Sequence, residues 1–272
     1  MSGGNTVTTL VPERRAWAVG AIHGEFERLC ALHEKLKRRL QPDDDIVYLG
    51  NFLGRGASVG KTVDELLGFR RAFLAKPPDQ HGDIFFLRGG QEEIWHKLLQ
   101  IQFSTGPGDV LEWMLGHGVG ATLNAYGGDG AEGLAAAREG VVALTKWTDG
   151  LRNAMRKRDG HNALMSSLRN AAASGNAILF VSAGLDPDAG LSSQGDAFWW
   201  GGQGFESIKE PKDTHRITDG GYRLVVRGFA ANHPGLDIGA ATATVDAGCG
   251  FGGPLLCACF TPEGEIADSI EA

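Results

Sequence analysis

Six short segments combine glycine with side chains that can bind anions or metal ions, and each adjoins an apolar run predicted to be a β-strand. These segments are 20–24 (GAIHG), 50–56 (GNFLGRG), 89–92 (GGQE), 181–185 (VSAGL), 226–229 (VRGF) and 245–248 (VDAG). In open α/β sheets, ligands bind in loops just past the carboxyl ends of the strands. We therefore expect the polar side chains of these segments to meet in one pocket, and the candidates are His23, Asn51, Arg55, Ser182 and Arg227.

The elements that would position these segments follow from hydrophobic periodicity. Short apolar strands are predicted at 15–20, 46–49 and 84–87, and helices at 26–40 and 59–75, where apolar residues recur at helical spacing. A β-α-β-α-β order of this kind is typical of a parallel sheet covered by helices.

The predicted secondary structure changes twice in the remainder of the chain. Residues 92 to about 170 read as a helical insertion, with helices at 92–102, 110–115, 141–147 and 151–168 and a loop at 127–133. Strands are predicted again at 178–181, 222–226, 241–245 and 255–260. We expect one domain over 15–268, preceded by an N-terminal tail at 1–14.

The ordered series of motifs resembles the calcineurin-like metallophosphoesterases, in particular the bacterial branch of PPP-type serine/threonine phosphatases and diadenosine tetraphosphate hydrolases. That family carries G-D-x-H-G, G-D-x-x-D-R-G, G-N-H-E, H-A-G-L and G-H in this order. The resemblance extends from about Arg15 to Ile266 and includes the similar tails at 183–187 and 246–255. It implies a four-layer α/β fold, with two mixed sheets facing each other and helices outside.

The resemblance also identifies the positions of the six main metal ligands of the family. They correspond to Ala21, His23, Asn51, Gly90, Ser182 and Phe229. Only His23 matches, and three of the replacements have no donor atom in the side chain. Two-metal hydrolysis needs a bridging carboxylate with further His, Asp and Asn ligands, and an amide such as Asn51 is a poor bridge. We therefore expect no metal and no cofactor, with His23, Asn51 and Ser182 as the residual candidates for a metal.

The general acid of the family is replaced as well. Its histidine corresponds to Gln91 and the aspartate that orients it to Gly54, and an amide cannot serve as a general acid. One phosphate-contacting arginine is retained as Arg55, whereas a second corresponds to Gly202. The resemblance thus implies a degenerate active site and a pseudophosphatase.

Each retained residue also has a purely structural interpretation. His23 is either a ligand or anion contact, or a histidine that stabilises its turn by hydrogen bonds. Arg55 either binds a phosphate or acidic peptide, or forms an ion pair, for example with Glu92. Arg227 either holds an anion or is a paired or solvated arginine. Glu92 suits the N-terminus of a helix.

Bulk properties narrow the classes of function. The net charge of −7 argues against a general binder of nucleic acid or of anionic membranes. No apolar stretch reaches the roughly 18 residues that span a bilayer, and no secretory signal is recognised. The four cysteines (Cys30, Cys249, Cys257 and Cys259) lack C-x-x-C spacing. We expect a cytoplasmic protein with free thiols.

Three functions remain open on these grounds. The first is a catalytically inactive protein that binds a protein partner or a phosphorylated or anionic ligand. The second is an atypical metal-dependent phosphoesterase that uses Mn, Fe or Zn, with Asp186 or Asp188 as additional ligands. The third is a scaffold that acts through the helical insertion. The sequence does not indicate the partner, the pathway or the oligomeric state.

Overall fold

Two mixed β-sheets form the centre of the molecule in a computed structural model, which describes residues 7–175, 177–201, 204–214 and 221–272. Within these residues, the six-stranded sheet has the order β1 (Val7–Leu10), β5 (Ala171–Ser174), β6 (Ile178–Val181), β7 (Leu224–Arg227), β9 (Thr242–Asp246), β8 (Gly235–Ile238). The five-stranded sheet has the order β11 (Ile266–Glu271), β10 (Leu256–Phe260), β2 (Ala16–Val19), β3 (Asp45–Tyr48), β4 (Ile84–Phe86). Strands β2, β3 and β4 are parallel, as are β6, β7 and β9, so their carboxyl ends point the same way within each sheet.

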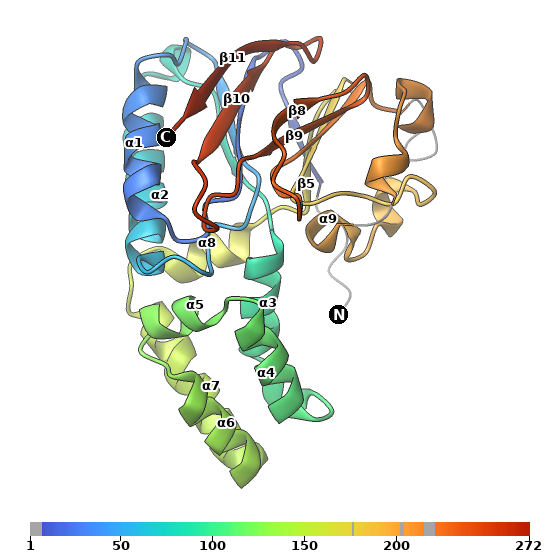
Figure 1. Cartoon of the computed structure of the whole chain (residues 1–272). Coiled ribbons are helices and arrows are strands. Elements are labelled where there is room, and N and C mark those ends of the chain that lie inside the picture. Colours follow the sequence, from blue (N-terminus) through green and yellow to red (C-terminus); the bar gives the residue numbers. More distant parts are fainter. Residues whose placement is uncertain (1–6, 176, 202–203, 215–220) are drawn as a thin grey trace.

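Helices cover the outer faces of the two sheets (Figure 1). Helices α1 (Phe26–Lys37) and α2 (Val59–Leu74) lie on the five-stranded sheet, and α9 (Ala197–Trp200) lies beside the six-stranded sheet. An inner core fills the space between the sheets with residues such as Val47, Phe180 and Phe260. The chain therefore has the four-layer α/β architecture that the resemblance implied.

Alternation along the strands explains why both faces of the five-stranded sheet are buried. In β10, Cys257 and Cys259 belong to the core under the helices, whereas Leu256, Ala258 and Phe260 belong to the core between the sheets. Successive side chains of a strand point to opposite faces, so a strand covered on both sides reads as a continuous apolar run.

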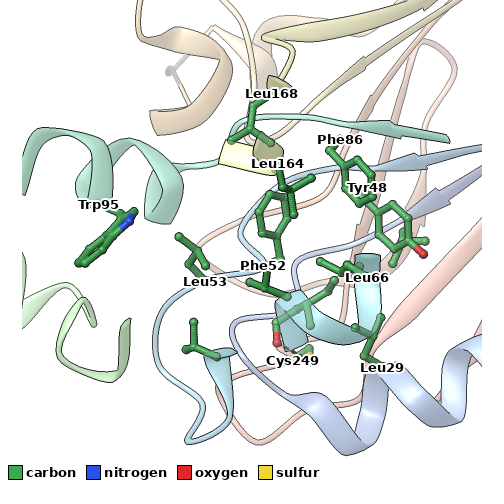
Figure 2. Close-up of a cluster of buried hydrophobic side chains, with 14 of the residues drawn as sticks. Leu29, Tyr48, Phe52, Leu53, Leu66, Phe86, Trp95, Leu164, Leu168 and Cys249 are labelled. Atoms are coloured by element: carbon green, nitrogen blue, oxygen red, sulfur yellow. Dashed lines mark hydrogen bonds between the residues drawn. The ribbon is translucent and has the colours of Figure 1, made fainter. Parts of the chain in front are cut away.

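The helical insertion shares a core with the sandwich. Its helices are α3 (Gly90–Leu98), α4 (Pro107–Gly116), α5 (Gly120–Ala125), α6 (Gly130–Glu139), α7 (Val141–Arg156) and α8 (His161–Ser167). Figure 2 shows Trp95, Leu164 and Leu168 of this region in the same hydrophobic cluster as Tyr48 and Phe86 of the sheet. Helices α4, α6 and α7 extend beyond the sandwich in Figure 1.

Four details of the predicted organisation are wrong. Residues 1–14 are not merely a tail, because β1 pairs in parallel with β5, Val7 opposite Ala171. The last strand runs to Glu271, beyond the predicted end at 268. The loop at 127–133 contains the start of α6, whose N-cap Asp129 accepts from the backbone N–H groups of Ala131 and Glu132 at 2.8 and 3.1 Å. Helix α7 continues through the gap between the helices predicted at 141–147 and 151–168, and the second of these is divided between the end of α7 and α8. Among the described residues, no helix is both long and apolar enough to cross a bilayer.

Candidate functional site

Backbone hydrogen bonds tie the loops after β2, β3 and β7 together. The N–H groups of Ile22 and His23 donate to the carbonyl of Asn51 at 3.0 and 2.7 Å, and the N–H of Ala21 donates to Gly228 O at 3.0 Å. The segments that were far apart in the chain thus meet at one end of the sandwich. Ala21 is buried and contributes only backbone contacts there.

Glu92 connects the loop after β3 to the loop after β4. Its buried carboxylate accepts from the backbone N–H groups of Asn51 and Gly89 through Oε2, at 2.7 and 2.9 Å, and from Leu53 through Oε1, at 3.0 Å. Burial raises the pKa of Glu92, and the three N–H groups oppose that shift. The role of Glu92 is structural, and the ion pair suggested between Glu92 and Arg55 is wrong because the carboxylate faces the backbone instead.

The imidazole of His23 contacts two aromatic rings. The rings of Phe229 and Phe251 meet its imidazole edge-on, with centroids 5.8 and 5.4 Å away. Both ring nitrogens are buried without a hydrogen-bond partner among the described residues. Burial, with a further contribution from the positive charge of Arg55, lowers the pKa of His23 to about 3, so the imidazole is neutral.

Gln91 and Gly54 are fitted to each other. A Cβ on Gly54 would lie 2.6 Å from Cδ of Gln91, so the Gln91 amide occupies the space that a larger residue would need. Nε2 of Gln91 donates to His117 O at 2.8 Å, and Oε1 is buried without a partner in the described structure.

Gly90 and Ser182 occupy two further ligand positions implied by the resemblance. A Cβ on Gly90 would lie 3.1 Å from Cζ3 of Trp200, so a side chain as long as asparagine would require Trp200 to move. Ser182 is fully buried, and its Oγ has no hydrogen-bond partner among the described residues. Asn51 Oδ1 already accepts from Gln91 N at 3.0 Å.

Arg55 is the exposed cation of the site. Its guanidinium carbon lies 4.1 Å from the ring centroid of Phe251, and its backbone N–H donates to Gly118 O at 3.1 Å. It forms no ion pair with any carboxylate in the described part of the chain. Its charge is therefore available to an anion from solution.

Arg227 makes its polar contacts with other side chains of the protein. Its Nη2 pairs with Oε1 of Glu206 at 2.7 Å, its Nε donates to Thr244 Oγ1 at 3.0 Å, and its guanidinium covers the ring of Phe205 at 4.0 Å. The side chain is largely buried and has these three partners, as the alternative of a paired arginine requires.

Unusual backbone geometry is concentrated in the same loops. Four non-glycine residues there have positive φ angles: His23 (51°), Asn51 (54°), Arg55 (42°) and His233 (45°). Such conformations are uncommon outside glycine and persist only where the surroundings enforce them. The loops hold these side chains in defined positions, as a binding site requires.

The donor set does not fit two divalent cations. Among the described residues it offers one neutral imidazole, one hydroxyl and amide oxygens, but no free carboxylate to bridge two metals. Asp246 is unsuitable too, because its oxygens accept from His233 Nδ1 at 2.8 Å and from the backbone N–H groups of Ala230 and Gly248. No group of three or more His, Cys, Asp or Glu side chains among the described residues could hold a metal ion.

Two other predicted ligands lie on the exposed loop that follows β6. Asp186 Oδ1 accepts from Asp188 N at 2.9 Å, and the backbone of Asp186 bonds to Gln194. Within the described residues, neither aspartate bonds to His23 or Ser182, whose side-chain polar atoms have no hydrogen-bond partner there. The position of the second family arginine, Gly202, lies outside the described residues.

Phe251 and His233 are the members of the site that sequence reasoning missed. Phe251 lies in a glycine-rich turn that was interpreted as a turn alone, and His233 shows no ligand spacing; their rings are 4.4 Å apart. The only sequence signal was an aromatic residue inside the run of glycines at 248–253.

No known family model matches the chain, and no curated protein matches it. Several solved structures, however, are similar to this chain in fold. A crystal structure of a candidate diadenosine tetraphosphatase superposes with a TM-score of 0.59 at 18% identity, covering 98% of each chain. A protein serine/threonine phosphatase from Saccharomyces cerevisiae gives a TM-score of 0.52 at 16% identity, covering 99% of this chain and 83% of that one. A cold-active protein tyrosine phosphatase gives 0.50 at 12% identity, covering 97% and 81%. With its two facing mixed sheets, this chain has the calcineurin-like metallophosphoesterase fold.

Proposed function

We propose that this metallophosphoesterase-like protein does not hydrolyse phosphoesters and instead binds a phosphorylated or acidic segment of a protein partner at the strand-end site. The observation that carries the proposal is the packing of Phe229 and Phe251 against His23. Aromatic rings occupy the surroundings of the one imidazole that the resemblance retains as a metal ligand, and no carboxylate of the described residues bonds to it.

Loss of the acid supports the same conclusion. Gln91 has no ionisable group, and its amide is held by His117 O and fills the space over Gly54. Protonation of a leaving group needs a positioned acid with a suitable pKa. Since Gln91 cannot supply one, weak metal binding alone would not restore the ordinary reaction.

The position of Arg55 supports the proposal that the site binds an anion. Its planar guanidinium presents several N–H donors that match a phosphate or carboxylate, and stacking on Phe251 limits its motion. Preorganisation of this kind lowers the entropic cost of binding.

Exposed aromatic residues nearby support a protein partner. Trp113 of α4 and Trp200 of α9 are 47% and 40% exposed, and their rings meet at 6.0 Å. Trp113 also stacks on His117, one residue before the Gly118 carbonyl that binds the Arg55 backbone. Tryptophan and arginine are enriched among the residues that dominate protein interfaces.

The catalytic half of the proposal is tested by elemental analysis of the native protein together with a p-nitrophenyl phosphate assay, with and without added Mn²⁺. We expect less than one equivalent of Mn, Fe or Zn and no turnover. Two retained equivalents of metal, or turnover that disappears in His23→Ala, would establish the atypical phosphoesterase instead.

The binding half is tested with an array of phosphoserine and phosphothreonine peptides and their unphosphorylated counterparts. Arg55→Gln should weaken phosphopeptide binding about tenfold, since hydrogen bonds between charged groups are among the stronger ones. Arg138→Gln on α6 removes the same charge from an exposed position and is the matched control. Equal binding by Arg55→Gln and the unaltered chain would favour a scaffold that does not use this site.

A further inference from the structure

A cavity lies between α3, α7 and α8, on the insertion side of the molecule. Its volume is about 390 Å³, within the range of roughly 300–1,000 Å³ that is usual for ligand pockets. Its wall contains none of His23, Asn51, Arg55 or Ser182. Glu92 borders it, but the carboxylate of Glu92 is turned to the backbone N–H groups of the strand-end loops.

Arginine is the most frequent charged residue in the wall of this cavity, although the whole chain carries a net charge of −7. Three arginines line it: Arg88, Arg152 and Arg156. Arg88 pairs with Glu93 at 3.0 Å and Arg152 with Asp149 at 2.6 Å, whereas Arg156 is exposed and has no ion pair with any described residue. The cluster therefore has at least one uncompensated cation.

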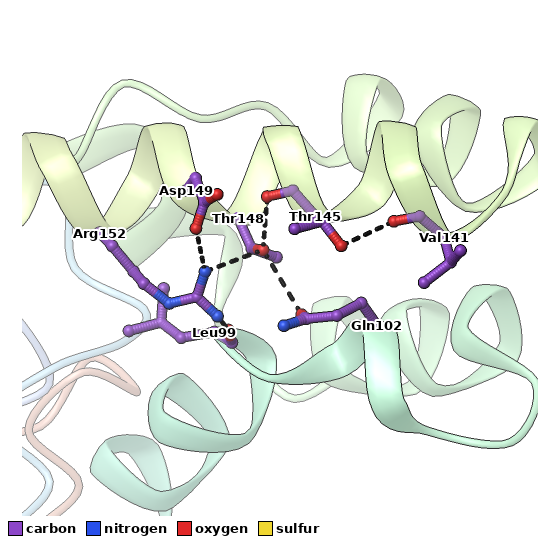
Figure 3. Close-up of polar contacts among 7 residues, drawn as sticks. All are labelled: Leu99, Gln102, Val141, Thr145, Thr148, Asp149 and Arg152. Carbon is purple, nitrogen blue, oxygen red and sulfur yellow. Dashed lines mark hydrogen bonds and ion pairs between the residues drawn. The ribbon is translucent and has the colours of Figure 1, made fainter.

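Arg152 is held in place before any ligand arrives. Figure 3 shows its guanidinium between Asp149, Thr148 and the carbonyl of Leu99. Nη1 donates to Asp149 Oδ1 at 2.6 Å and to Thr148 Oγ1 at 3.3 Å, and Nη2 donates to Leu99 O. The Nε–H group is not used in these bonds. A fixed guanidinium with a spare donor loses little freedom when it binds an anion.

The rest of the wall is apolar. Trp95, Met155, Met165 and Leu168 contribute to it, and Met155 also accepts from the indole N–H of Trp95 at 3.4 Å. Methionine side chains adapt to ligands of different shape. A phosphate ion alone would leave these surfaces unused, so they suit an organic group joined to the anion.

We propose that this cavity binds a small organic phosphate or phosphonate, with the anionic group at Arg88, Arg152 and Arg156 and the apolar body against Met155, Met165 and Leu168. This site is separate from the strand-end site and does not depend on whether that site binds a phosphorylated partner or hydrolyses one.

Isothermal titration of the full chain with phenylphosphonate and with methylphosphonate tests the proposal. The two probes carry the same anionic group, differ in apolar body and resist hydrolysis, so the measurement holds even if the protein proves to be an active phosphoesterase. Phenylphosphonate should bind about tenfold more tightly, since burying a phenyl group contributes through apolar area. Equal affinity for the two probes would overturn the assignment of the apolar wall.

Three substitutions locate the site. Arg156→Gln should weaken phenylphosphonate binding about tenfold, while Arg138→Gln, with the same loss of charge on α6, should leave it unchanged. Arg156 is exposed, and an unchanged thermal melt would verify that its variant is folded. Loss of binding in Arg55→Gln but not in Arg156→Gln would assign the probe to the strand-end site and overturn the inference. Equal weakening by Arg138→Gln and Arg156→Gln, or no binding of either probe at millimolar concentration, would also overturn it.

Discussion

The guanidinium of Arg55 covers the ring of Phe251, 4.1 Å from its centroid, and joins the loop after β3 to the glycine-rich turn after β9. Phe251 also contacts His23, and the plane of the imidazole is at 90° to the plane of the Phe251 ring. Arg55 thus covers the Phe251 ring and at the same time presents its charge to solvent. Burial lowers the pKa of Arg55, but arginine titrates from so high a value that it remains charged at neutral pH.

The Arg55–Phe251 contact should be measurable as a coupling. In a double-mutant cycle of Arg55→Gln and Phe251→Leu, we expect a coupling free energy of about 0.5–1 kcal/mol, because the cation–π contact lies at an exposed position. Urea unfolding of the four proteins measures it. Arg138→Gln combined with Phe251→Leu provides the control and should be additive. Additivity in the Arg55 cycle as well would mean that the stack contributes nothing.

Gly54 and Gln91 should depend on each other in the same way. Gly54→Ala introduces a methyl group into the space of the Gln91 amide at a φ of +85°, and we expect a loss of about 2–4 kcal/mol in the free energy of unfolding. Gln91→Ala empties that space. The double variant should therefore be more stable than the sum of the single effects predicts, by at least about 1 kcal/mol.

Denaturant unfolding of the two single variants and the double variant gives this comparison. If the double variant loses the full sum, the cost of Gly54→Ala lies in backbone strain alone and the two residues are not fitted to each other.

The architecture could be predicted from sequence because strand positions and strand-end motifs repeat a simple rule. Apolar runs such as 46–49 and 178–181 fall on strands, and the polar segments after them meet at one end of the sheets. The strands that were missed are short or at the edge. β1 (Val7–Leu10) has two threonines and partners only β5, so its burial depends on a strand more than a hundred and fifty residues later.

The contents of the site were harder to predict because they depend on side-chain direction. Arg227 follows an apolar strand like other site residues, yet its side chain turns to Glu206 and Phe205, which no local pattern indicates. Glu92 was assigned a structural role from its place at a helix start, and its three backbone contacts agree. Phe251 enters the site only because the turn after β9 folds back over His23, and this long-range contact has no sequence signature.

His23 should make the protein sensitive to acid. Its pKa is lowered to about 3 in the folded state, so between pH 6.5 and about 3 the unfolded chain binds a proton that the folded chain does not. Stability contributed by the neutral imidazole is therefore present above pH 6.5 and is lost as the pH falls. Each pH unit in this window corresponds to about 1.4 kcal/mol for one such group.

The contribution of His23 can be isolated with His23→Phe. Burial also lowers the pKa of His33 and His161, so the unaltered protein should lose stability in acid from several groups at once. Urea unfolding at pH 6.5 and pH 5.0 should show a loss that is about 2 kcal/mol smaller in His23→Phe than in the unaltered chain. An equal loss in both proteins would show that His23 is protonated in the folded state or exchanges with solvent.

We expect the substitution of Arg227 to affect mainly stability and the substitution of Arg55 to affect mainly binding. Arg227→Gln removes the buried hydrogen bond to Thr244 and the packing on Phe205, and we expect a loss of about 1–3 kcal/mol in the free energy of unfolding. The ion pair with Glu206 adds little to this figure because the Glu206 side chain is 69% exposed. Arg55→Gln should change stability by less than about 1 kcal/mol, since its main contact is an exposed stack.

For phosphopeptide binding, we expect Arg55→Gln to have a larger effect than Arg227→Gln. Arg55→Gln should weaken it about tenfold, while Arg227→Gln, measured at a temperature where that variant is fully folded, should leave it unchanged. The reason is geometric, because the donors of Arg227 are directed to Glu206 and Thr244 and are not free to meet an anion. If Arg227→Gln weakened binding as much as Arg55→Gln, the guanidinium of Arg227 would have to leave Glu206 when the ligand binds, and both arginines would then belong to the anion site.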